Sequence, residues 1–161
     1  MKRLGLVLAL LSAPAVAQDR DAFAVWGESS GSLPPEYAWD YTVSFFPDRH
    51  GEVTYCKGYS DAPPGCATTR FRLTRPDFAA LQTALAPLEA DLAAKPAAEA
   101  VDIPVGGGSV GGRLQMNGRD LRLPAFPAEA DAARVDAVIR LLRENTPERA
   151  VRSAKSKARA P

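Results

Sequence analysis

The chain has 161 residues, of which 46% are hydrophobic, and its 20 basic and 19 acidic residues give a formal net charge of +1. This length and composition predict one domain with one sizeable core. After the first seventeen residues no stretch approaches the roughly 20 apolar residues that a membrane-spanning helix needs. No motif in the chain is specific enough to define a biochemical activity.

The N-terminus has the pattern of a secretory signal peptide. Basic residues at positions 2 and 3 precede an apolar run at 4–11, and the sequence AVA at 15–17 is a typical cleavage signal. We therefore predict that residues 1–17 are removed after Ala17 and that the mature chain is periplasmic or secreted. No cysteine follows the cleavage signal, so we expect no lipid anchor.

Residues 18–37 are polar and rich in glycine, serine and proline, and we expect an irregular lead-in with at most one short strand near residues 23–26. From residue 39 the apolar side chains alternate up to residue 45. The turn sequence DRHG and a return strand that contains Val53 and Tyr55 follow. This pattern predicts a β-hairpin, and the alternation in TTRFRLT at 68–74 predicts a third antiparallel strand.

The only two cysteines, Cys56 and Cys66, flank the loop between the second and third predicted strands. An oxidising compartment favours a disulfide between them. A redox dithiol prefers two intervening residues, and a zinc site needs about four ligands, whereas this chain has two Cys and one His. We predict a structural disulfide that holds the enclosed loop and displays Tyr59 on it.

The sequence TRPD at 74–77 combines an N-cap, an early proline and a capping acid, and leucines then recur at helical spacing to about residue 94. An extended segment is expected at 98–105. The dipeptide NG at 117–118 predicts a second hairpin, and the stripe in VDAVIRLL predicts a second helix.

Together these elements predict an α+β fold with the order β-β-β-α-β-β-α. We expect a single domain at 38–146, in which two hairpin regions form one antiparallel sheet and both helices pack on one face.

The glycine-rich stretch VGGGSVGG at 105–112 matches two catalytic motifs by composition alone. A nucleophile elbow around Ser109 would need a following helix and a later histidine, but the only histidine, His50, precedes it. A dinucleotide-binding turn would likewise need to open a helix. We expect a flexible loop or a glycine-bulged edge strand that can approach a partner closely, with Ser109 as a candidate partner-binding residue.

Residues 147–161 carry five basic residues and one acidic residue, whereas 18–146 carry 13 basic and 18 acidic residues. We expect a basic disordered tail. The alternative is weak adhesion of this tail to anionic surfaces such as lipid, lipopolysaccharide or nucleic acid. No specific nucleic-acid partner is expected.

The segments SSGSLPPEY, RPDFAALQTAL and VDAVIRLL, together with the order of the elements over residues 26–143, resemble the small emfourin-type inhibitors of bacterial metalloproteases. The resemblance implies binding to a protein partner. It assigns no inhibitory residue.

We expect a non-catalytic binding module of the cell envelope, inhibitor-like or immunity-like, that docks on an enzyme and uses no cofactor or metal. Its loops would carry recognition, with Tyr37 and Tyr59 as the candidate anchors. Two alternatives remain open. One is a small carboxylate-dependent hydrolase or isomerase, which buried acids lining a pocket would favour. The other is an envelope structural protein without a dedicated ligand.

Overall fold

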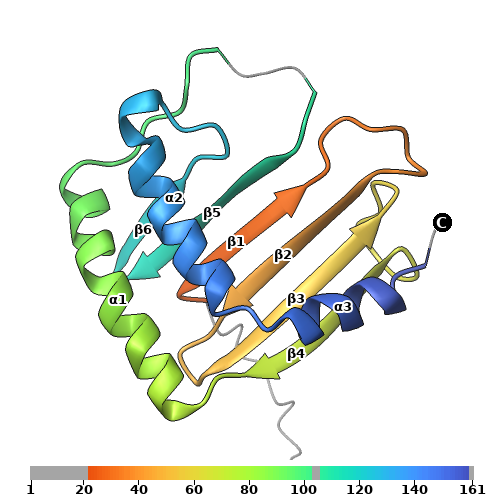
Figure 1. Cartoon of the computed structure of the whole chain (residues 1–161), viewed down its shortest axis with the longest axis horizontal. Helices are drawn as coiled ribbons and strands as arrows, with labels where there is room; N and C mark the ends of the chain where they lie inside the picture. The colour runs from red at the N-terminus through yellow and green to blue at the C-terminus, as the bar shows by residue number, and fades with distance from the viewer. Residues whose placement is uncertain (1–21, 103–105, 160–161) are drawn as a thin grey trace, which may run out of the picture.

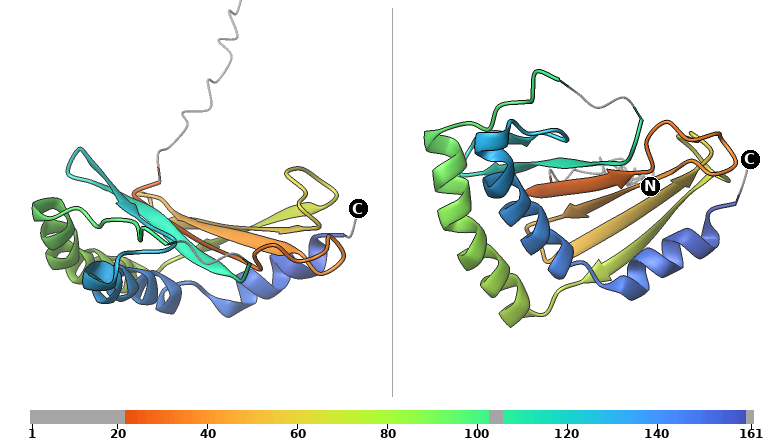
Figure 2. Two further views of the ribbon diagram at one scale, coloured as in Figure 1. Left: turned by 90° about the horizontal axis from the view of Figure 1, so that it is seen from above. Right: turned by 45° about the horizontal axis from the view of Figure 1, so that its top comes forward.

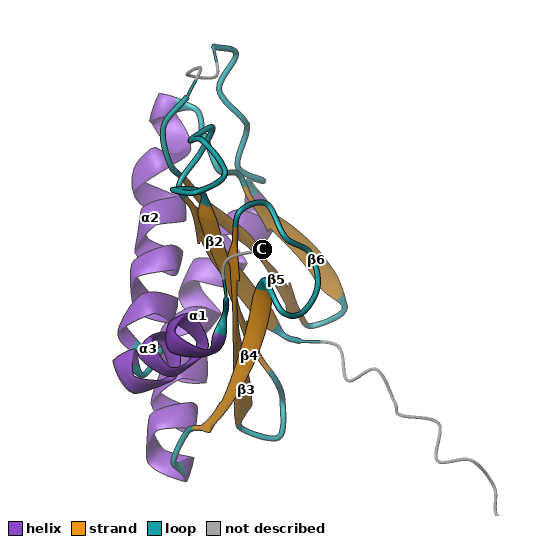
Figure 3. Ribbon diagram, turned by 90° about the vertical axis from the view of Figure 1, so that its right-hand side faces the viewer, coloured by secondary structure: helices purple, strands orange, loops and turns teal. Residues whose placement is uncertain are grey.

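The computed structural model describes residues 22–102 and 106–159, so the expected signal peptide lies outside the described residues. The chain forms one six-stranded antiparallel sheet with the strand order β4-β3-β2-β1-β5-β6. All three helices lie on one face of this sheet, so that the molecule has two layers (Figures 1, 2 and 3). The α+β class, the single domain and the one-sided helices are as predicted, but a third helix is present.

The strands are β1 (Ala24–Ser29), β2 (Trp39–Phe45), β3 (His50–Lys57), β4 (Cys66–Arg72), β5 (Ser109–Met116) and β6 (Arg119–Leu123). The helices are α1 (Arg75–Ala94), α2 (Glu129–Glu144) and α3 (Glu148–Lys157). Both expected hairpins are present, as β2–β3 and β5–β6. At the tip of the second one Asn117 and Gly118 have φ angles of 52° and 73°, as a type I′ turn requires.

Strand β1 lies where at most one short strand was expected within the irregular lead-in at 18–37, but it continues to Ser29 and is not peripheral. It occupies the middle of the sheet, where it pairs with β2 on one side and with β5 on the other. Only Ala24 and Trp26 bring buried apolar side chains to the helix-covered face, since Gly27 and Glu28 follow. The apolar alternation in the sequence is therefore too short to indicate a central strand. The two neighbouring strands stabilise β1 through their hydrogen bonds.

The glycine-rich stretch forms a loop at 106–108, as expected, but its second half is not an edge strand. Gly111 and Gly112 lie inside β5, which is an interior strand that pairs with both β1 and β6. A Cβ atom on Gly112 would collide with the Val25 carbonyl oxygen, and one on Gly111 would lie 2.9 Å from the Leu123 carbonyl oxygen. The glycines thus permit the close approach of neighbouring backbone.

The expected disordered tail is instead helix α3, which packs on β3 and β4. Its inner face consists of small apolar residues, of which Ala150, Ala154 and Ala158 are buried. Alanine at every fourth position forms a helical stripe, but the surrounding Lys, Arg and Ser residues give the segment the composition of a solvated tail. Among the described residues no helix is both long and apolar enough to cross a membrane.

Helix α1 begins and ends where the sequence indicated. The Thr74 hydroxyl oxygen accepts a hydrogen bond from the Asp77 amide at 3.2 Å, which caps the first turn. The helix buries Leu81, Leu85 and Leu92 toward α2 and the β5–β6 half of the sheet. The leucine stripe is therefore core, as its spacing predicted.

Candidate functional site

Three connecting segments meet at one end of the sheet, at the upper right of Figure 1. They are residues 30–38 between β1 and β2, residues 58–65 between β3 and β4, and residues 106–108 before β5, and we call them together the loop end. The Gly58 amide donates to the Ala38 carbonyl oxygen at 3.0 Å. A Cβ atom on Gly31 would collide with the Gly107 carbonyl oxygen, so these two backbones are in contact.

The disulfide is formed as predicted and closes the base of one of these segments. Cys56 and Cys66 are directly opposite each other on β3 and β4, with Cα atoms 4.1 Å apart and an S–S bond of 2.04 Å. Inside the loop the Cys66 amide donates to the Ala62 carbonyl oxygen at 3.0 Å. From the C-terminus the Arg159 amide donates to the Pro64 carbonyl oxygen at 3.0 Å. The loop is therefore held at its base and at its outer side.

The loop end carries three of the four large apolar side chains that are strongly exposed in the described structure. Leu33, Tyr37 and Tyr59 are 42%, 66% and 60% exposed, and the fourth, Val101, is 99% exposed on the segment between α1 and β5. The Tyr59 hydroxyl donates to the Leu33 carbonyl oxygen, so this ring ties two loops together. The structure thus brings both sequence-selected tyrosines to one surface. Exposed aromatic rings on an ordered backbone are typical of protein-binding sites.

Ser109 lies at the start of β5 rather than on an exposed loop. Its hydroxyl oxygen is 2.9 Å from the Ser29 hydroxyl oxygen, and both side chains are partly buried. On the sheet face opposite the helices, Ser109 lines a shallow hollow of about 180 Å³ together with Asp40 and Thr42. Burial raises the pKa of the Asp40 carboxyl group. The Ser109 side chain therefore joins β5 to β1 next to the loop end and is not displayed for binding.

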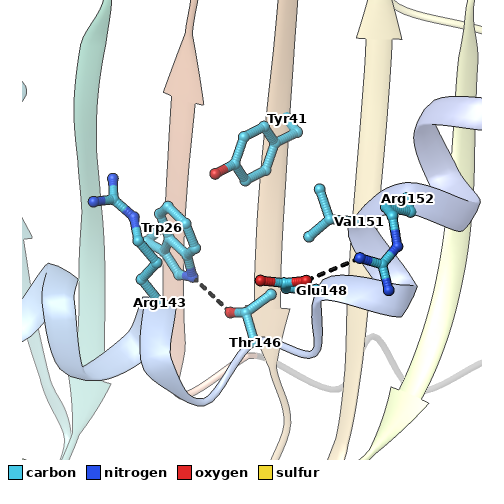
Figure 4. Close-up of a pocket in the computed structure, with 7 residues that line it drawn as sticks. All are labelled: Trp26, Tyr41, Arg143, Thr146, Glu148, Val151 and Arg152. Carbon is cyan, nitrogen blue, oxygen red and sulfur yellow. Dashed lines mark hydrogen bonds and ion pairs between the residues drawn. The ribbon is translucent and has the colours of Figure 1, made fainter.

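A second feature, which the sequence did not indicate, is a groove of about 370 Å³ on the helix-covered face between α2 and α3 (Figure 4). The groove combines aromatic rings from the sheet with charged side chains from the helices. Its lining residues are Trp26, Tyr41, Arg143, Thr146, Glu148, Val151 and Arg152. They come from β1, β2, α2, α3 and the α2–α3 connection, so no local motif contains them.

The groove contains a connected polar cluster above its aromatic floor. The Tyr41 hydroxyl donates to Glu28 Oε2 at 3.0 Å, and Arg143 Nη2 donates to the same oxygen at 3.3 Å. The Arg143 guanidinium also lies 5.2 Å from the centre of the Trp26 ring, within the range of a cation–π contact. Trp26 Nε1 donates to the Thr146 hydroxyl oxygen at 3.2 Å. Burial, with the negative charge of Glu28, raises the pKa of Tyr41 to about 12, so its hydroxyl remains a donor at neutral pH.

The aromatic floor continues beyond the groove along β2 and β3. The rings of Trp39, Tyr41 and Tyr55 lie within 15° of parallel, with centroids 6.0 to 6.4 Å apart. Lys155 of α3 reaches over this row, with Nζ 5.8 Å from the centre of the Tyr55 ring. We call Trp39, Tyr41 and Tyr55 the aromatic row. Trp39 and Tyr41 are partly exposed and give the sheet face between α2 and α3 an apolar surface, whereas Tyr55 is buried beneath α3.

The buried acids do not form the arrangement that the hydrolase alternative requires. Asp131 accepts hydrogen bonds from the Ala98 amide at 3.0 Å and from Arg134 Nη1 at 2.6 Å. The Ala98 amide, then Arg134, hold the pKa of Asp131 below its usual value, so it is an ionised structural anchor. Glu89 accepts from Asn117 Nδ2 at 3.2 Å, and neither acid lines the groove. Within residues 22–102 and 106–159 no group of three His, Cys, Asp or Glu residues is placed to hold a metal ion.

Comparison with known proteins does not add a family. No protein-family model matches this chain, and no curated protein matches it in sequence.

Proposed function

We propose that the chain is an exported, non-catalytic binding module of the cell envelope that docks on a protein partner through the loop end. One observation carries the proposal. Of the four large apolar side chains that are strongly exposed among the described residues, three gather at this end: Leu33, Tyr37 and Tyr59. Clustered exposed apolar groups favour an interface, whereas single ones are ordinary on a protein surface.

The backbone of the loop end is ordered before any partner binds. The disulfide, the Tyr59 to Leu33 hydrogen bond and the contact of Gly31 with Gly107 each restrain it. Association is weakened by the entropy lost when loops become ordered, and a preformed surface reduces that loss. Tyr37 is suited to act as an anchor because a tyrosine ring offers a large contact area with few rotatable bonds.

Two observations support the proposed location and kind of partner. A disulfide is typical of proteins that fold in an oxidising compartment, which agrees with the secretory pattern of residues 1–17. The resemblance to emfourin-type inhibitors favours an enzyme, such as a metalloprotease, as the partner. The partner would then be another periplasmic or secreted protein.

The test compares three forms of the mature chain as baits in an envelope extract from the cells that produce the protein. These forms are the unchanged chain, Tyr37→Ala and the matched control Val101→Ala, which removes an exposed apolar side chain outside the loop end. We expect one dominant protein to be retained by the unchanged chain and by the control. Tyr37→Ala should bind that protein at least about tenfold more weakly, because interface anchors typically contribute about 2 kcal/mol.

The folding of each variant is checked by circular dichroism before capture. Equal retention by Tyr37→Ala and by the unchanged chain would contradict docking through the loop end. If the retained partner is a protease, its activity is measured with and without the mature chain. Inhibition that Tyr37→Ala weakens would support the inhibitor form of the proposal.

A further inference from the structure

We propose that the groove between α2 and α3 binds the C-terminal residue of a peptide, with Arg143 holding the terminal carboxylate and the aromatic floor holding the last side chain. This site is on the helix-covered face, separate from the loop end, and the inference does not rest on the proposed function.

The groove has an excess of hydrogen-bond donors. Arg143 donates through Nη2 to Glu28, and Arg152 donates through Nη1 to Glu148. A guanidinium carries several further N–H groups and no acceptor, whereas Glu28 Oε2 already accepts from both Tyr41 and Arg143. A complementary ligand therefore presents acceptors, and a carboxylate matches a guanidinium with two parallel hydrogen bonds.

Arg143 is better placed than Arg152 to receive this carboxylate. Its guanidinium is oriented by Glu28 and by the face of Trp26, and half of its side chain surface is exposed, at 50%. The Arg152 side chain is 72% exposed and pairs with Glu148 one helical turn before it. An orientated guanidinium loses less entropy on binding than a mobile one. Arg152 thus forms the opposite wall of the groove.

The floor and size of the groove suit one apolar side chain. Tyr41 and Val151 provide partly exposed ring and methyl surfaces, and the buried Trp26 ring lies behind Arg143, as Figure 4 shows. A volume of about 370 Å³ is near the lower limit of the roughly 300 to 1,000 Å³ that small-ligand sites occupy. The last residue of a peptide, with a leucine-sized or phenylalanine-sized side chain, is of this scale.

The aromatic row explains why the ligand is a chain rather than an isolated small molecule. Trp39 is partly exposed and stacks on Tyr41, so it extends the apolar surface from the groove along β2, whereas Tyr55 is covered by α3. The residues that precede a bound C-terminus would lie beside Trp39. A run of phosphates is less suited to the groove than a single carboxylate, because Glu28 and Glu148 stand next to the two arginines and repel each negative charge that a ligand brings.

The basic helix contributes attraction at longer range. Exposed Arg149, Lys155 and Lys157 add positive charge to α3 beside the groove. Clustered positive charge raises the local concentration of anionic ligands and accelerates their association. The effect is screened by salt, so we expect weaker binding as the ionic strength rises.

The first experiment titrates the ¹⁵N-labelled mature chain with the probe acetyl-Gly-Gly-Gly-Phe, which has a free C-terminal carboxylate. The same peptide with an amidated C-terminus is the matched control. We expect amide and indole shifts at Trp26, Arg143 and Thr146 for the free acid, and at least about tenfold weaker binding for the amide. Equal binding of both peptides, or no binding of the free acid at millimolar concentration, would overturn the proposal.

The second experiment uses variants. Arg143→Met should weaken binding of the free acid about tenfold, whereas Arg140→Met, an exposed arginine of the same helix that does not line the groove, should leave it unchanged. Val151→Trp should also abolish binding, because it fills the groove and keeps Arg143. This variant decides the question if Arg143→Met folds poorly.

Two outcomes would assign the groove differently and so contradict the proposal. One is binding of a ten-nucleotide oligothymidylate that displaces the peptide, which would indicate a nucleic-acid surface. The other is peptide binding that Arg143→Met and Val151→Trp both leave intact. Tyr37→Ala should bind the peptide normally, so failure of the loop-end proposal and failure of this one are distinguishable.

Discussion

The two halves of the helix-covered sheet face are closed in different ways. Over β1, β5 and β6, helices α1 and α2 bring large side chains to the core, including Leu81, Leu85, Val138 and Leu142. Over β3 and β4, helix α3 brings only alanines to its buried positions. A helix with a narrow alanine face covers a narrow strip of sheet, so the groove between α2 and α3 stays open, with Trp39 and Tyr41 partly exposed beside it and Tyr55 buried under α3. The groove between α2 and α3 is thus present because α3 covers little of the sheet.

The first prediction concerns the half of the sheet face that α1 and α2 cover with large side chains. Leu85 of α1 is completely buried, and Leu85→Ala should lower the free energy of unfolding by about 2 to 5 kcal/mol, because it leaves a cavity in the core. Urea denaturation measures the change. Gln82→Ala, at an exposed position of the same helix, is the control and should change stability by less than about 0.5 kcal/mol. Similar values for both variants would contradict the assignment of this core.

The second prediction concerns the disulfide between β3 and β4, the two strands that α3 covers. The double substitution of Cys56 and Cys66 by serine should lower the free energy of unfolding by about 3 kcal/mol, because the unfolded chain regains the freedom of the loop. Reduced unchanged protein should show a loss of similar size in the same urea experiment. Full retention of stability in both samples would show that the disulfide does not support the fold.

The third prediction tests whether the packing of α3 on β3 and β4 contributes to stability. Ala154 is completely buried, and Ala154→Gly should cost about 2 kcal/mol, from about 0.8 for the lost methyl group and about 1 for helix propensity. Ser156→Gly, on the exposed side of α3, should cost only about 0.5 kcal/mol. Hydrogen exchange should show lost protection in β3 and β4 before β5 and β6. Equal costs for the two variants would indicate that α3 is not packed.

The fourth and smallest effect is at the boundary between the halves, at Tyr41. Its pKa of about 12 lies above the ordinary 10.0, so the neutral phenol is favoured in the folded state. The stability linked to this group is therefore complete below about pH 10 and is lost as the pH rises through 12. Glu28→Gln removes a nearby negative charge and should lower the pKa of Tyr41, while Arg143→Met should raise it.

Absorbance titration of the tyrosines, or NMR of the labelled Tyr41 ring, measures these shifts. A lower pKa after Arg143→Met would contradict the arrangement of Tyr41, Glu28 and Arg143. Unchanged values in both variants would show that the three groups do not interact in solution.

Elements with strong local signals were predictable from the sequence. The β2–β3 and β5–β6 hairpins, the capped helix α1 and the pairing of Cys56 with Cys66 each depend on residues that are close together in the chain. The length and central position of β1, for which only a short strand near residues 23–26 was expected, and helix α3 were missed because their stability depends on neighbours. Two flanking strands complete the hydrogen bonds of β1, and the apolar face of β3 and β4 accepts the alanines of α3.

The two candidate binding surfaces, the loop end and the groove, also differ in how far the sequence could predict them. Tyr37 and Tyr59 could be selected from the sequence because both lie in turn-rich segments, where side chains are commonly exposed. The groove could not be selected, because Trp26, Tyr41 and Arg143 are far apart in the chain and each has a simpler interpretation as core or as surface charge.

The sequence by itself determined the α+β class, the positions of the two hairpins and of α1 and α2, and the disulfide, because capping, turn and alternation preferences act over a few residues. The tertiary structure alone decided that β1 is a central strand, that the basic C-terminal segment is a docked helix, and that the loops meet at one end. It also placed Arg143 over the aromatic floor beside α3. These features depend on which surfaces come together when the sheet forms, and long-range packing of this kind leaves no periodic signal in the chain.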